Sequence, residues 1–304
     1  MKKILSALAV ALCGLLSVTT AIATDITVKN AAGEQVVPQN PQKVVVLDLA
    51  AADTIRALGE KDKIVGITNG IYTPQYLQEF NDAKYTNVGT MPEPSFEKIN
   101  ELAPDLIVAG SRQLKVFDRL KEIAPVFIVQ NDYNNFYQGI EQNVTALGQI
   151  FNKEAEAQSK LAALNDKVTE LQKLTKDKTA LVILVNESNI SAYGDTSRYS
   201  LVYQKFGFTP VDKNIKSSTH GMKVGFEYVL EQNPDYLLVV DRTSAITEKA
   251  GNAQKVLNNE IINQTKAAKN GNIVYLQPAN WYLAFGGLEG TEMMAAEIEN
   301  AVTK

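Results

Sequence analysis

Cysteine and histidine are almost absent from this chain of 304 residues, which has one of each, Cys13 and His220. Zinc sites in proteins take three or four ligands, drawn mostly from those two residue types. The sequence therefore argues against a zinc enzyme and against a zinc or manganese carrier. A single cysteine also excludes an intramolecular disulfide, so the fold must be stabilised by packed cores.

Long apolar segments are missing too, except at the N-terminus. Two lysines are followed by an apolar run over residues 4–16 and by small residues that end at Ala23. This order is typical of a secretory signal peptide cleaved after Ala23, and the run is shorter than the ~20 residues of a membrane-spanning helix. We expect residues 1–23 to be removed and the mature protein to be periplasmic. A lipid anchor at Cys13 is the weaker alternative, because the bulky Leu12 precedes it.

Arginine is also scarce. Among the 30 basic residues only five are arginines, namely Arg56, Arg112, Arg119, Arg198 and Arg242. The formal net charge of −4 gives no support to nucleic-acid binding. A guanidinium group is a planar fork of donors that suits oxyanions and aromatic faces. The positions of the few arginines in the fold therefore bear on function.

Short apolar strands alternate with helical patterns through most of the chain, which predicts parallel βαβ units. We expect strands at residues 43–47, 64–67, 105–109, 126–129, 180–185, 236–240 and 273–276, and helices at 51–58, 96–102, 116–123 and 287–302. Residues 153–174 contain no Gly or Pro and have apolar residues at helical spacing, which predicts one long amphipathic helix.

The predicted fold is thus α/β, with two lobes that are joined by this single long α-helix. Each lobe has a central, mostly parallel sheet flanked by helices. We place the signal peptide at 1–23, the N-terminal lobe at 24–152, the connecting helix at 153–178 and the C-terminal lobe at 179–304.

An internal repeat supports the two lobes. Residues 96–112 align without gaps on residues 226–242, with six of 17 positions identical. In each copy a short helix leads through Pro-Asp into an apolar strand, and an arginine, Arg112 or Arg242, follows the strand. Ligands bind at the carboxyl ends of strands in open α/β sheets, so these two arginines predict an anion site. A single arginine is equally often a surface or ion-paired residue.

Three further candidates lie in polar or aromatic segments. Arg198 ends the polar segment 193–198, and His220 lies in the glycine-containing segment 216–221. The expected loop at 277–287 holds Trp281, the only tryptophan, beside Tyr282. A deprotonated tyrosine is a hard oxygen ligand that suits iron(III). Packing against a core edge is the alternative role for both aromatic residues.

Taken in order, several segments resemble the periplasmic binding proteins that serve ferric-siderophore and cobalamin importers. They are residues 43–47 after Pro41, residues 88–99, the two Pro-Asp repeats, the long helix and the Gly286-Gly287 helix start. The resemblance extends over essentially all of the mature sequence. It implies a binding protein without catalytic activity and without a cofactor of its own, and we expect a monomer.

Within that family the chain looks most like the catecholate binders, in which three arginines surround the ligand and a histidine and a tyrosine complete the coordination of iron. By this resemblance Arg112, Arg198 and Arg242 contact a ferric siderophore, and His220 and Tyr282 are iron ligands. We expect Trp281 to contact the ligand as well. The resemblance also implies that one glutamate on each lobe docks on an ABC permease. Glu97 and Glu227 match those positions, although a carboxylate in the first turn of a helix is favourable in any case.

Two other functions are weaker. Haem, cobalamin or a hydroxamate siderophore would suit the same fold, and haem propionates are anions as well. An exported Ser/His/Asp hydrolase with His220 as its base would need a nucleophile, yet no Gly-x-Ser-x-Gly motif occurs.

Overall fold

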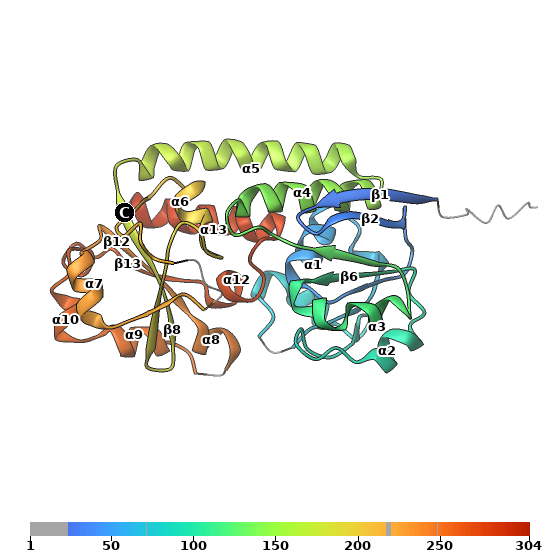
Figure 1. Cartoon of the computed structure of the whole chain (residues 1–304), viewed down its shortest axis with the longest axis horizontal. Coiled ribbons are helices and arrows are strands. Elements are labelled where there is room, and N and C mark those ends of the chain that lie inside the picture. Colours follow the sequence, from blue (N-terminus) through green and yellow to red (C-terminus); the bar gives the residue numbers. More distant parts are fainter. Residues whose placement is uncertain (1–23, 71, 217–219, 248) are drawn as a thin grey trace, which may run out of the picture.

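The computed structural model describes residues 24–304 apart from residues 71, 217–219 and 248, so the predicted signal peptide lies outside the described residues. The chain forms two α/β lobes side by side, with one long helix running over both (Figure 1). This arrangement confirms the predicted fold class. Within the described residues, no helix combines the length and the apolar character that crossing a membrane requires.

The N-terminal lobe is built on a five-stranded sheet in the order β5-β4-β3-β6-β7, and all its neighbouring strands are parallel. Helices cover both faces, which explains why the central strands are continuous apolar runs. Its strands are β1 (Asp25–Asn30), β2 (Gly33–Pro38), β3 (Val44–Val46), β4 (Ile64–Ile67), β5 (Thr86–Asn87), β6 (Leu106–Gly110) and β7 (Val126–Val129). Its helices are α1 (Leu49–Ala57), α2 (Phe96–Glu101), α3 (Phe117–Lys121) and α4 (Phe136–Ile150), with 3-10 turns η1 (Lys61–Lys63), η2 (Gln75–Asn81) and η3 (Ser111–Val116).

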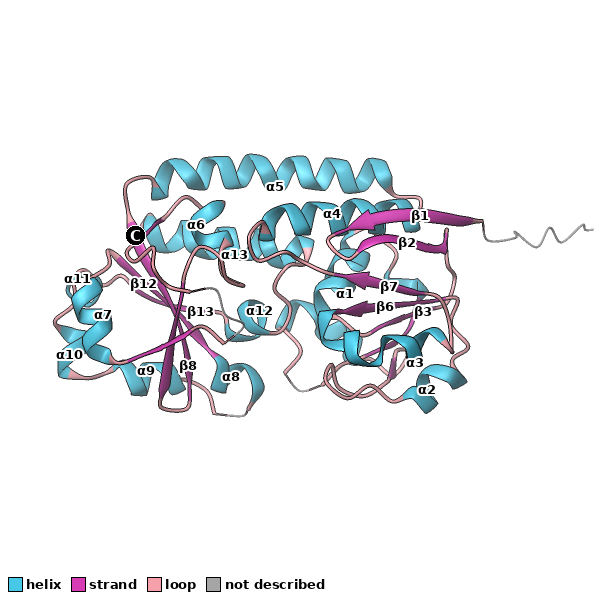
Figure 2. Cartoon of the chain, viewed as in Figure 1, coloured by secondary structure: helices cyan, strands magenta, loops and turns pink. Residues whose placement is uncertain are grey.

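The sheet of the C-terminal lobe is mixed. Strands β10, β8, β12 and β13 are parallel, whereas β9 and β11 add an antiparallel edge. Figure 2 labels β8, β12 and β13 in this lobe. Its strands are β8 (Thr179–Asn186), β9 (Asn189–Tyr193), β10 (Thr209–Pro210), β11 (Met222–Val224), β12 (Tyr236–Asp241) and β13 (Ile273–Leu276). Its helices are α6 (Leu201–Gln204), α7 (Phe226–Gln232), α8 (Arg242–Ile246), α9 (Asn252–Leu257), α10 (Glu260–Asn263), α11 (Lys266–Lys269), α12 (Pro278–Tyr282) and α13 (Leu288–Val302).

One helix joins the two lobes along the chain, and a second helix packs across their junction. The predicted long helix is α5 (Glu154–Thr175), which packs on α4 of the N-terminal lobe and on α13. Helix α13 lies beneath α5 in Figure 1, and it also contacts α1 in the N-terminal lobe. Helix α4 was not predicted, although its buried residues Ile140, Val144 and Leu147 have helical spacing.

The internal repeat has a structural counterpart. Asp105 accepts hydrogen bonds from the main-chain N–H groups of Gln42 (2.8 Å) and Lys43 (2.9 Å), just before β3. Asp235 accepts from the N–H of Thr179 (2.8 Å), the first residue of β8. In both lobes the Pro-Asp aspartate therefore fixes the start of the strand that pairs with the repeat's own strand.

Candidate ligand-binding cleft

Two adjoining cavities lie between the lobes and share the lining residues Arg112 and Leu283. The first cavity, of about 460 Å³, is bordered by α1, the segment that joins β7 to α4, Arg198, Leu283 and residues 285–286. The second cavity, of about 400 Å³, is bordered by residues 68–70, 72–73 and 90–92, by Arg242 and by Tyr282. Each has a size that is usual for small-molecule sites.

Arg242 is held in place by two side chains of the C-terminal lobe. Its Nε donates to the hydroxyl oxygen of Tyr282 (2.7 Å), and its Nη1 donates to Oδ1 of Asn186 (2.7 Å). The preceding residue, Asp241, caps α8 by accepting from the N–H of Ser244 (2.9 Å). The strand end, the cap and the hydrogen bonds thus fix the guanidinium group beside the Tyr282 ring.

Arg198 is 7% exposed and lies among aromatic rings. Its guanidinium carbon is 4.1 Å from the ring centre of Phe285 and 4.8 Å from that of Tyr282. One Nη donates to the carbonyl oxygen of Tyr282 (3.0 Å), whereas its buried Nε has no hydrogen-bond partner among the described residues. An unsatisfied buried donor is costly, so this nitrogen is suited to receive a ligand acceptor.

Arg112 differs from the other two arginines because its side chain is exposed. Its Nη1 donates a long hydrogen bond to Sδ of Met91 (3.6 Å). Within the described part of the chain, none of Arg112, Arg198 and Arg242 forms an ion pair with a carboxylate. The three predicted arginines therefore border the cleft without a direct carboxylate partner among the described residues.

Trp281 corrects one expectation. The segment after β13 is not a loop but the short helix α12, with Pro278 in its first turn. Trp281 is 1% exposed and its indole N–H donates to Glu297 on α13 (2.7 Å). Trp281 therefore packs in the core instead of contacting a ligand, and the helical turn directs the neighbouring Tyr282 toward the cleft.

His220 is exposed, and it lies beside residues 217–219, which are outside the described residues. The residue after His220, Gly221, has a φ of +72°, and a Cβ at this position would lie 2.8 Å from the ring of Tyr193. This neighbouring tyrosine is buried, and burial raises the pKa of its hydroxyl to about 12. His220 does not line either cavity as the structure describes them. Its contact with a ligand stays a prediction.

A buried carboxylate that the sequence did not reveal ties the cleft loop to the N-terminal lobe. Asp53 on α1 accepts hydrogen bonds from the N–H groups of Glu289 (3.0 Å) and Gly290 (2.7 Å), at the start of α13, and from the hydroxyl of Tyr76 (3.1 Å). Burial raises the pKa of Asp53 to about 7, against the opposing effect of the backbone hydrogen bonds. Three residues shortly before this contact, Leu283, Phe285 and Gly286, line the first cavity.

Two further contacts strengthen this junction of α1 with α13. The Thr54 hydroxyl accepts from the N–H of Leu288 (3.2 Å), and Arg56 forms an ion pair with Glu289. No sequence motif marks these residues, because their partners lie more than 230 positions away in the chain.

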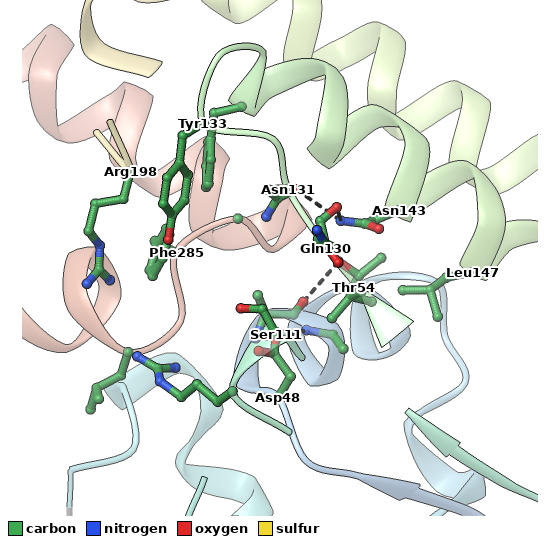
Figure 3. Close-up of a pocket in the computed structure, with 17 residues that line it drawn as sticks. Asp48, Thr54, Ser111, Gln130, Asn131, Tyr133, Asn143, Leu147, Arg198 and Phe285 are labelled. Atoms are coloured by element: carbon green, nitrogen blue, oxygen red, sulfur yellow. Dashed lines mark hydrogen bonds between the residues drawn. The ribbon is translucent and has the colours of Figure 1, made fainter. Parts of the chain in front are cut away.

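The polar end of the first cavity was not predicted from the sequence either. Figure 3 shows Arg198, Tyr133 and Phe285 on one side and a group of small polar side chains on the other. That group consists of Asp48, Thr54, Ser111, Gln130, Asn131 and Asn143. Asn143 joins part of it, since its Nδ2 donates to Oδ1 of Asn131 (3.0 Å). The available signal was weak: residues 130–135 are a polar run directly after a predicted strand.

The two glutamates predicted to dock lie far from the cleft on different lobes. Glu97 is in the first turn of α2 and Glu227 is in the first turn of α7, and both are exposed. Helices α2 and α7 lie near opposite ends of the molecule in Figure 1.

The fold, the cleft between two lobes and the single long connecting helix define a class of extracytoplasmic binding proteins. The sequence profile described as periplasmic binding protein matches residues 44–279, which is more than half of the chain and spans both lobes. The chain belongs to the periplasmic binding protein family.

Several relatives resemble the chain over nearly its whole length. The petrobactin-binding protein YclQ of Bacillus subtilis is 39% identical over 270 residues, which cover 88% of this chain and 84% of the relative. The ferric-anguibactin-binding protein FatB of Vibrio anguillarum is 30% identical over 282 residues, covering 90% and 87%. Because the matches cover most of each chain, the similarity includes both walls of the cleft.

Solved structures give the same result. The crystal structure of YclQ has a TM-score of 0.89 at 38% identity and covers 92% of this chain and 99% of its own. The structure of the periplasmic catecholate-siderophore binding protein VctP of Vibrio cholerae has a TM-score of 0.86 at 32% identity, covering 91% and 100%.

Proposed function

We propose that this protein binds an iron(III)–catecholate siderophore in the cleft between its lobes and delivers it to an ABC importer. The observation that carries the proposal is the set of three arginines, Arg112, Arg198 and Arg242, which border adjoining cavities without carboxylate partners among the described residues. A ferric catecholate is an anion whose charge is spread over oxygens on aromatic rings. Guanidinium groups bind such oxygens by charge-assisted hydrogen bonds and stack on the rings.

The relatives support this ligand class. Their names refer to petrobactin, ferric anguibactin and a catecholate siderophore. Export, delivery to a permease and the absence of catalytic activity belong to the same proposal. Membership of the family and the predicted signal peptide support them.

In this proposal Tyr282 and His220 complete the coordination of iron when the siderophore supplies only four donor oxygens. Tyr282 borders the second cavity, and the hydrogen bond that Arg242 donates to its hydroxyl oxygen holds that oxygen in place. A siderophore with six donor oxygens would leave neither residue a place on the metal.

The ligand is tested by titrating the purified protein with an iron(III) bis-catecholate while following Trp281 fluorescence and the visible charge-transfer band. Since Trp281 is buried, quenching is expected to arise from energy transfer to the coloured complex and not from contact. Haemin and a ferric hydroxamate are the competing ligands. Saturation by the bis-catecholate alone supports the proposal, whereas saturation by haemin or the hydroxamate alone would contradict it.

The same titration tests direct coordination. We expect the charge-transfer band to shift on binding to the wild type, and the shift to be lost in Tyr282→Phe and reduced in His220→Ala. An identical shift in wild type and both variants would show that the protein does not coordinate iron.

Docking is tested by charge reversal on the two exposed glutamates. Glu97→Lys and Glu227→Lys are expected to reduce siderophore-dependent uptake without changing siderophore affinity. Glu101→Lys, on the same helix as Glu97, is the matched control. Equal uptake by all three variants would remove these glutamates from the permease interface.

A further inference from the structure

The first cavity is asymmetric in charge. The charged side chains among its described lining residues are Arg112, Arg198 and Asp48. Asp48 lies with neutral polar side chains, away from Arg198, as Figure 3 shows. A carboxylate repels the anionic ligand that the arginines attract, so charge on the iron complex does not explain its presence.

The carboxylate of Asp48 has a fixed orientation. Its Oδ1 accepts from the N–H groups of Ala50 (3.0 Å) and Ala51 (3.1 Å), which caps α1. Its Oδ2 lies against Gly110 at the end of β6, where a Cβ would collide with it. In the described part of the chain Oδ2 makes no hydrogen bond and Asp48 forms no ion pair, so one oxygen is left for a ligand.

A cation beside Oδ2 would stabilise the charged form of Asp48. Burial raises the pKa of Asp48, and the positive charge of Arg112 only partly opposes this effect. An anionic ligand that engages Arg112 would weaken even this compensation.

From this juxtaposition we propose that Asp48 binds a protonated amine in the arm of the siderophore, so that the ligand is a catecholate whose chelating groups are joined by an amine-containing linker. This inference rests on the proposed function and specifies its substrate. The neighbouring Gln130 and Asn131 side chains offer neutral hydrogen-bonding groups for the rest of the polar linker. Asp48 thus selects among catecholates, while the arginines select for the anionic iron centre.

The test uses two synthetic iron(III) bis-catecholates of equal length, one with a secondary amine in its linker and one with an ether oxygen at the same place. We expect the wild type to bind the amine ligand about tenfold more tightly, which corresponds to about 1.4 kcal/mol. Asp48→Asn retains an oxygen that can cap α1. It is expected to bind both ligands equally, and Asp48→Ser, which also preserves a cap, is expected to behave in the same way.

The control is Asp132→Asn, which removes the same charge from an exposed turn close to the cavity. It is expected to retain the preference for the amine. Equal binding of both ligands by the wild type, or a preference that survives in Asp48→Asn, would overturn the inference while leaving catecholate binding intact. If Asp132→Asn also lost the preference for the amine ligand, the preference would come from the overall negative charge near the cavity. That outcome would contradict a direct contact between Asp48 and the amine. Failure of both ligands to bind would refute the proposed function, and the inference with it.

Discussion

Each lobe forms one wall of the cleft and carries an arginine at the same position of the internal repeat. The two arginines differ in how firmly their surroundings hold them. Arg242 on the C-terminal wall is fixed by Tyr282 and Asn186, whereas Arg112 on the N-terminal wall is exposed and its side chain makes a long hydrogen bond to Met91. The residues before the arginines explain the difference. Asp241 accepts from Ser244 (2.9 Å) and Ala253 (2.7 Å) and so orders the start of α8.

The equivalent residue on the other wall is Ser111, which begins the 3-10 turn η3. A serine lacks the second oxygen with which Asp241 joins α8 to α9. Preorganised groups lose less entropy on binding, so we expect the C-terminal wall to supply most of the binding energy. We expect the N-terminal wall to affect mainly the association rate and the choice of ligand.

The largest effect should come from the most buried arginine. Arg198→Met retains much of the side-chain volume but removes the charge beside Phe285 and Tyr282, so affinity for a ferric catecholate should fall about 100-fold. Loss of charge-assisted hydrogen bonds of about 1.5–3 kcal/mol accounts for this magnitude. Fluorescence titration measures it.

Arg119→Met is the matched control for that variant. Arg119 also stacks on an aromatic ring, at 3.8 Å from the centre of Phe96, but it lines neither cavity in the described residues. Affinity should be unchanged. A comparable loss in Arg119→Met would show that the effect of Arg198→Met comes from destabilisation.

The contact that joins the two walls is expected to depend on pH. The pKa of Asp53 is about 7 in the folded protein, above its ordinary value of 3.8, because the carboxylate is buried. Between these values the folded protein retains a proton that the unfolded chain releases. Asp53 therefore contributes a decrease in the free energy of unfolding as pH rises from about 4 to 7, by at most about 1.4 kcal/mol per pH unit.

Urea unfolding of wild type and Asp53→Asn at several pH values measures this contribution, because the variant lacks it. Asp212→Asn is the control, because the N–H of Asn214 lowers the pKa of Asp212 instead of raising it. The contribution of Asp212 to the free energy of unfolding therefore increases as pH rises, and it does so at lower pH than the contribution of Asp53. Parallel curves for wild type and Asp53→Asn would show that Asp53 has an ordinary pKa.

A double-mutant cycle tests whether the C-terminal wall is preorganised. Tyr282→Phe and Arg242→Gln are each expected to weaken ferric catecholate binding about tenfold. The double variant should lose less than the product of the two effects, because either change breaks the same 2.7 Å hydrogen bond. Strictly multiplicative losses would mean that the two side chains act independently.

Sequence patterns could predict the α/β lobes, the long helix and the positions of Arg112 and Arg242 because each follows from local periodicity or from the repeat. Arg198 lies outside the repeat, and its prediction depended on its polar segment and on the family resemblance. They could not predict the Asp53 contact, since it joins α1 to α13 across more than 230 residues. They failed at Trp281 for a local reason. Adjacent residues of a short helix point in different directions, so Trp281 enters the core while Tyr282 faces the cleft.

The smallest effect is expected on the N-terminal wall. Arg112→Gln should reduce equilibrium affinity only about twofold to fivefold, because an exposed charge at the rim contributes little to the bound state. The reduction should lie in the association rate, and the dependence of that rate on salt should be weaker than in the wild type. Stopped-flow quenching at two salt concentrations measures both. A loss as large as that of Arg242→Gln, with an unchanged association rate, would mean that the ligand itself orders Arg112 and that the two walls are equivalent in the complex.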